Sequence, residues 1–156
     1  MGRGTWQANA VMNIGAAYMR QQKFSTAWES LSVALDLAKQ SGEDRVRGRA
    51  LLNLGMVGWQ LKKPEAAALI EEALEWYEGD GKEIYTPSER EAVKQDGLRL
   101  LSRIARDRKD EAAAEKYDRQ YFEAIGPDPD RYGAIRSSPC FAIYVGRPAK
   151  EASTQR

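Results

Sequence analysis

The residues of this chain that could do chemistry are a row of arginines and one cysteine, and no histidine accompanies them. Arg99, Arg103 and Arg106 recur at helical spacing, so we expect them to share one helix face. Such a face could bind a phosphate or an acidic peptide, and the alternative is a solvated face paired with nearby acids. Cys140 has no histidine to activate it, so a structural cysteine is expected.

The absence of histidine removes the commonest general base near neutral pH and the commonest ligand of transition metals. Glu71, Glu72 and Glu75 are expected on a solvated outer face rather than in a paired-carboxylate site. The sequence has no phosphate loop, dinucleotide fingerprint or metal-ligand spacing. We therefore expect no enzyme, no cofactor and no metal site, with catalysis by carboxylates, lysine or tyrosine as an alternative.

The charge balance gives the chain no general attraction to polyanions. Its 156 residues include 24 basic and 23 acidic ones, for a net charge of +1. This argues against nucleic-acid and membrane partners, and RNA binding is only an alternative. No apolar run approaches the roughly 18 residues that span a bilayer, and residues 1–6 lack the apolar core of a signal peptide. With a single cysteine, these features favour a cytoplasmic protein.

Hydrophobic periodicity predicts six helices, over about 6–21, 24–40, 44–61, 64–78, 87–107 and 110–125. Gly42 has the position of a left-handed helix cap at the end of the second helix. Pro64 can open the fourth helix at its first position, where a missing N–H costs nothing. Thr86, Pro87 and Glu89 have the spacing of a capping box at the start of the fifth helix.

The chain divides into a helical domain over residues 1–125 and an irregular tail over residues 126–156, which contains several prolines and glycines. Within the tail, Phe141 to Val145 is apolar and typical of an extended segment. We expect this segment to lie against the last helices, where it would cap the repeats or block their groove, or against a partner.

The first two helix pairs repeat each other. Gly15 and Gly55 each follow an asparagine and an apolar residue, and they lie 40 positions apart; Ala27 and Ala66 follow them in turn. A glycine inside a helix costs about 1 kcal/mol relative to alanine, so it is tolerated where two backbones must come close. A repeat of this period indicates stacked helical hairpins.

These residues resemble the tetratricopeptide repeat (TPR) family, in the form with a period longer than usual. The first repeat matches at Ile14, Gly15, Tyr18, Ala27, Leu31 and Ala34, and the second at Leu54, Gly55, Ala66 and Ala73. A weaker third repeat matches at Leu100, Ile104, Ala113 and Tyr117, but Leu101 replaces its glycine and Gln120 its alanine. The resemblance covers about residues 6–125. It implies an all-α, short right-handed superhelix of three antiparallel helix pairs, followed by the irregular tail.

In the family, the first helix of each pair lines a concave groove that binds a partner. Carried over to this chain, the groove residues are Asn9, Met12, Asn13, Met19, Arg20, Arg49, Leu52, Asn53, Met56, Trp59, Arg99 and Arg106. The alternative for the large apolar members Met12, Met56 and Trp59 is a place in the core. Methionine adapts to ligands of varied shape, and arginine favours carboxylates.

The resemblance implies a protein–protein interaction module, an adaptor or assembly subunit that binds an acidic or amphipathic segment of another protein. A regulatory peptide-sensing domain that acts on an effector partner is the alternative. Chaperone-binding members of the family clamp a terminal carboxylate with five basic and amide residues, and only Asn53 and Arg99 match that set here. A chaperone tail is therefore not the expected partner, and the sequence leaves the oligomeric state open.

Overall fold

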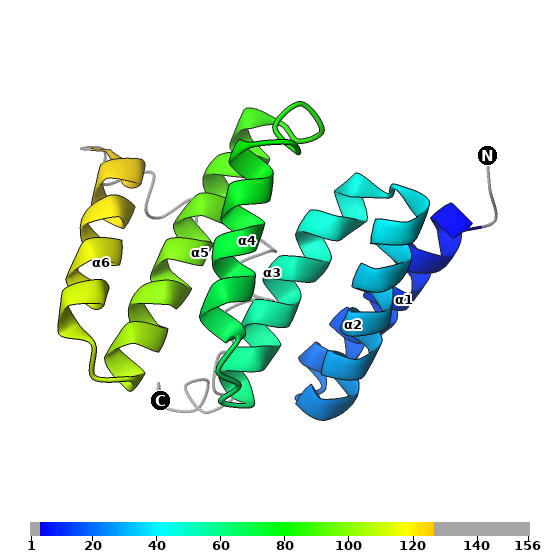
Figure 1. Cartoon of the computed structure of the whole chain (residues 1–156), viewed down its shortest axis with the longest axis horizontal. Helices are drawn as coiled ribbons and strands as arrows, with labels where there is room; N and C mark the ends of the chain where they lie inside the picture. The colour runs from blue at the N-terminus through cyan, green and yellow to red at the C-terminus, as the bar shows by residue number, and fades with distance from the viewer. Residues whose placement is uncertain (1–3, 127–156) are drawn as a thin grey trace, which may run out of the picture.

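The computed structural model describes residues 4–126, and within them the chain forms six helices and no strand (Figure 1). They are α1 (Gly4–Arg20), α2 (Phe24–Ser41), α3 (Asp44–Gln60), α4 (Ala66–Glu78), α5 (Pro87–Asp107) and α6 (Glu111–Ile125). Successive helices run antiparallel in one row (Figure 1), which confirms the all-α class. Residues 127–156, with Cys140 and the segment from Phe141 to Val145, lie outside the described residues.

Two of the helix-end signals read from the sequence, those at Thr86 and Gly42, act as expected. At the start of α5, the Glu89 N–H donates to Thr86 Oγ1 (3.2 Å) and the Thr86 N–H donates to Glu89 Oε2 (2.8 Å). The Thr86 N–H bond also holds the pKa of Glu89 below its usual range. Gly42 ends α2 with a φ of 70°, the left-handed conformation that favours glycine.

The prediction for the start of α4 is wrong by two residues. Pro64 and Glu65 form a turn, because the Ala66 N–H donates to the Lys63 carbonyl (3.3 Å), and α4 begins only at Ala66. Pro64 therefore belongs to the connection between α3 and α4.

The connections α1–α2, α3–α4 and α5–α6 share one turn. Each contains a non-glycine residue in the left-handed region: Gln22 (φ 59°), Lys62 (φ 55°) and Lys109 (φ 60°). In each, the N–H of that residue donates to the carbonyl three positions back, and the next N–H donates to the carbonyl five positions back (2.9 and 3.0 Å at the first turn). The internal repeat therefore extends to the backbone, although no glycine marks these turns in the sequence.

We expect Gln22→Gly to stabilise the protein by about 0.5–1 kcal/mol, because glycine removes the steric cost of the left-handed conformation. Gln22 is exposed, so no packing is lost. Urea denaturation measures the change. Gln21→Gly is the control, since Gln21 is also exposed but its φ is not positive, and there glycine should only destabilise. Equal effects of both changes would contradict the argument.

The glycines of the repeat allow close contact within each helix pair. A Cβ on Gly15 would lie 2.7 Å from Leu31 Cγ, and a Cβ on Gly55 would overlap the Ile70 side chain and lie 3.2 Å from the Ala66 carbonyl oxygen. Ala66 is 1% exposed and Ala27, its counterpart in the first pair, is fully buried. The expectation that small residues bring these helices together is confirmed.

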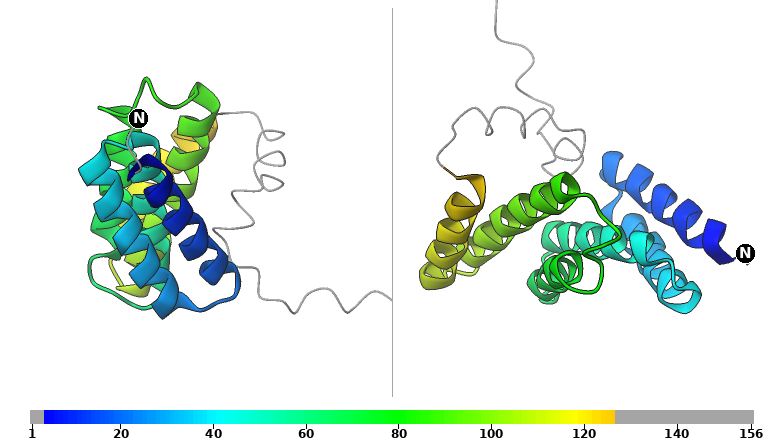
Figure 2. Two further views of the ribbon diagram at one scale, coloured as in Figure 1. Left: turned by 90° about the vertical axis from the view of Figure 1, so that its right-hand side faces the viewer. Right: turned by 90° about the horizontal axis from the view of Figure 1, so that it is seen from above.

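The odd-numbered helices form a continuous layer. Besides packing against its neighbours in the chain, α3 approaches both α1 and α5. The backbone of α4 approaches α2 and α6 less closely, and side chains make the contacts there, such as Glu72 with Lys39 and Glu71 with Tyr117. Seen from above, the helices follow a zigzag row along the long axis (Figure 2). The row therefore offers one extended surface built from α1, α3 and α5.

The core is divided unequally along this row. The main hydrophobic cluster runs from Ala8 on α1 to Ile104 on α5. A small second cluster of Leu98, Tyr121 and Ile125 joins α5 to α6. The last helix also packs Tyr117 against the main cluster, but its buried residues are only Ala114, Tyr121 and Ile125.

Candidate partner-binding surface

The predicted groove residues come from α1, α3 and α5, and the structure separates them by burial. Five are buried: Met12, Met19, Leu52, Asn53 and Met56. Met12 and Leu52 have no exposed surface, and Met56 is 3% exposed. For Met12 and Met56 the structure shows the core alternative, and Leu52 is buried in the same way, so these three support the helix layer but present no side chain to a partner. Trp59, the third residue with that alternative, is half-buried.

The remaining predicted residues keep exposed surface. Asn13, Arg20, Arg49 and Arg106 are exposed, and Asn9, Trp59 and Arg99 are half-buried. The accessible part of the α1–α3–α5 layer is therefore basic and amide-bearing rather than methionine-rich. Arg20 and Arg49 make no ion pair within the described part of the chain.

Arg99, Arg103 and Arg106 of α5 do not form one binding face. Arg106 donates to the Asp118 carboxylate of α6, and this contact holds the pKa of Asp118 below its usual range. The Arg99 guanidinium lies over the Tyr121 ring of α6, 5.6 Å from its centroid. Arg103 instead lies over the Trp59 ring of α3, 5.9 Å from its centroid. Arg106 therefore follows the alternative of pairing with a nearby acid.

Three polar side chains of α3 and α5 are buried without complete hydrogen bonding. Asn53 Oδ1, Gln95 Oε1 and Asp96 Oδ1 are buried and have no hydrogen-bond partner in the described structure. Burial raises the pKa of Asp96 to about 6, against the opposing charge of Arg99. A buried acceptor without a donor costs about 1–3 kcal/mol, so these groups reduce stability.

A cleft of about 650 Å³ lies where α3 and α5 end, beside the α3–α4 turn. Trp59, Ala66 and Ile104 supply its apolar surface. The indole Nε1–H of Trp59 donates to Asp107 Oδ2 (2.7 Å), which joins the last turn of α3 to that of α5. This bond fixes the ring at the edge of the cleft.

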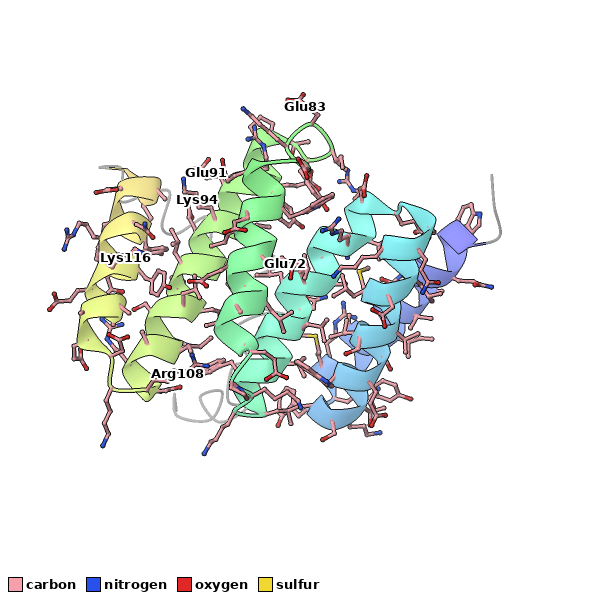
Figure 3. All side chains as sticks on the ribbon, in the orientation of Figure 1. Glu72, Glu83, Glu91, Lys94, Arg108 and Lys116 are labelled. Atoms are coloured by element: carbon pink, nitrogen blue, oxygen red, sulfur yellow. The ribbon has the colours of Figure 1, made fainter. Side chains whose placement is uncertain are left out.

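Cations line the opening of this cleft. Lys62, Lys63 and Arg108 all contribute to its lining. The Arg108 Nη2–H donates to the Pro64 carbonyl (2.7 Å), and Lys63 Nζ lies 4.6 Å from the centroid of the Trp28 ring. None of the three makes an ion pair among residues 4–126. In Figure 3, Arg108 is labelled at the end of α5 that lies near the α3–α4 turn.

Sequence reasoning placed Trp59 on the surface but missed the rest of this cleft. Its cations follow the ends of two helices that are far apart in the sequence, and only the parallel course of α3 and α5 brings those ends together. The available signal was the pair of basic segments, Lys62-Lys63 and Arg108-Lys109, placed directly after two predicted helices.

Over residues 4–126, no group of three or more histidine, cysteine, aspartate or glutamate side chains is arranged to hold a metal ion. In the same range, no helix combines the length and the apolar character that crossing a membrane requires. Comparisons of the chain with protein-family models, with curated proteins and with solved structures found no match.

Proposed function

We propose that this protein is a protein–protein interaction module, an adaptor or assembly subunit that binds a segment of a partner across the α1–α3–α5 layer. We further propose that its helix pairs form a short right-handed superhelix of the TPR kind. Stacked helical hairpins create extended surfaces suited to long ligands, and they bury little that could serve as a catalytic centre.

The observation that carries this proposal is the continuous layer with exposed, unpaired arginines. Because α3 contacts both α1 and α5, a single ligand can cross all three helices. Arg20 on α1 and Arg49 on α3 are exposed and make no ion pair within residues 4–126, so both can bind an acidic group. By contrast, α2, α3 and α4 are joined on another side by Lys39 and Arg47, which both pair with Glu72.

Affinity capture with a charge-reversed layer tests the proposal. We expect Arg20→Glu with Arg49→Glu to lose proteins that the unchanged chain retains, since repulsion replaces attraction for an acidic segment. The matched control is Lys82→Glu with Arg119→Glu, which makes the same change in charge at exposed sites on the α4–α5 loop and α6. Helicity measured by circular dichroism must stay unchanged. Identical sets of retained proteins for both variants would contradict the proposal.

A further inference from the structure

We propose that the cleft at the ends of α3 and α5 binds an acidic partner segment that carries a bulky apolar side chain beside its carboxylates. This inference rests on the proposed function and deepens it, because it states the chemistry of the segment that anchors at one end of the layer. Three features of the cleft carry it: its shape, its charges and its rigid construction.

The shape of the cleft fits a side chain with its flanking backbone. A volume of about 650 Å³ lies within the range of ligand sites, which are concave, mostly apolar and equipped with a few polar groups. Ile104 and Ala66 are 4% and 1% exposed, so they form a floor rather than a protruding patch. Trp59 is half-buried and adds an aromatic wall. An apolar side chain entering here would be removed from water on several sides.

The positive charges at the opening favour a negatively charged ligand. Lys62, Lys63 and Arg108 carry three positive charges there, and no carboxylate within residues 4–126 forms an ion pair with them. The one acidic residue of the lining, Asp107, already accepts the Trp59 indole hydrogen bond. Cations after a helix end also offset the helix dipole, which accounts for their place in the sequence. It does not account for the cleft that they line, which also has apolar walls.

The construction of the cleft suits binding without large rearrangement. Two hydrogen bonds join its two sides, which are far apart in the sequence. Trp59 donates to Asp107, 48 positions on, at 2.7 Å, and Arg108 donates to the carbonyl of Pro64, 44 positions back, at 2.7 Å. A site whose walls are already joined loses little conformational entropy when a ligand enters. The Trp59 indole N–H is also a local reporter, because it lies at the edge of the cleft.

The test is a titration of the full chain, labelled with nitrogen-15, with the peptide Gly-Ser-Asp-Leu-Glu-Glu and with its phenylalanine analogue, followed by NMR. The chain has 4 tryptophans, and Trp59→Phe identifies the indole signal of Trp59. We expect at least one of the peptides to shift that signal saturably, and a version with Asn and Gln in place of the acids not to do so. Replacing the apolar residue by alanine should weaken binding about tenfold.

Charge variants separate this inference from the proposed function. We expect Lys62→Glu with Arg108→Glu to weaken peptide binding at least about tenfold, and the Lys82→Glu, Arg119→Glu control to change it less than about twofold. The inference is overturned if millimolar amounts of both peptides leave the Trp59 signal unmoved, if the cleft variant binds as tightly as the control, or if inorganic phosphate alone produces the same shift. In those cases, loss of captured proteins by the Arg20, Arg49 variant would still support the proposed function.

Discussion

Replacing Gly55 by leucine should destabilise the protein by about 2–3 kcal/mol, because the α3–α4 contact leaves no room for a side chain. A Cβ at this position would overlap Ile70 and would lie 3.2 Å from both the Ala66 carbonyl oxygen and the Ile70 backbone nitrogen. Side-chain rotation could relieve the first contact but not the backbone contacts, so the two helices would have to separate. Thermal and urea denaturation should show the loss, with a melting temperature lower by about 5–10 °C.

Two further variants show whether crowding is the cause. Ala68→Leu adds the same side chain at an exposed position of α4 and should change stability by less than about 0.5 kcal/mol. Ile70→Ala makes room beside Gly55, so the combined Gly55→Leu, Ile70→Ala protein should be more stable than the sum of the two single changes indicates. Strict additivity would show that the helices do not meet at this glycine.

Asp96→Asn should stabilise the protein at neutral pH by about 2–3 kcal/mol and have almost no effect at pH 4. Burial raises the pKa of Asp96 to about 6 from the usual 3.8, so the carboxyl group of Asp96 holds its proton more tightly in the folded protein than in the unfolded chain. A shift of one pKa unit corresponds to about 1.4 kcal/mol. Asparagine has nearly the same shape but carries no charge, which removes the penalty.

The sign of the pH dependence follows from the raised pKa. At Asp96 the folded protein binds more protons than the unfolded chain between pH 4 and 6, so the contribution of this residue to stability falls as the pH rises through that window and is constant above it. Glu89 and Asp118 have lowered pKa values and act in the opposite direction, but they are present in both proteins and cancel in the comparison. Urea denaturation from pH 4 to 8 measures the difference, with Asp80→Asn on the exposed loop as a control for lost charge. A difference between Asp96→Asn and the unchanged chain that does not vary with pH would refute the argument.

Local signals predicted most of the fold. Helix periodicity located all six helices, and the capping box at Thr86 marked the start of α5 to the residue. Gly15 and Gly55 revealed where helices meet, because a glycine inside a helix needs a reason in packing. The start of α4 was missed because the choice between a turn and a first helical residue at Pro64 depends on one hydrogen bond, from Ala66 to Lys63.

The candidate site was harder to predict. The family resemblance placed Met12 and Leu52 in the groove, but both are buried. Burial depends on how closely neighbouring helices approach, which a sequence pattern does not show. The ion pair of Arg106 with Asp118 depends on the packing of α6 against α5. The cleft beside Trp59 arises from two chain segments that share no local pattern.

The small cluster between α5 and α6 has a consequence for how the molecule comes apart. The last helix is tied to the rest through the apolar side chains of Leu98, Tyr121 and Ile125 and through polar contacts. The Tyr117 hydroxyl donates to Glu71 of α4 (2.6 Å), and Asp118 accepts from Arg106 of α5. In a row of helix pairs that contact only their nearest neighbours, local unfolding starts at the less stable end and propagates along the row. The amide protons of α6 should therefore exchange with solvent before those of α3. A partner segment bound across several helices would couple them, so that the whole row would unfold as one cooperative unit.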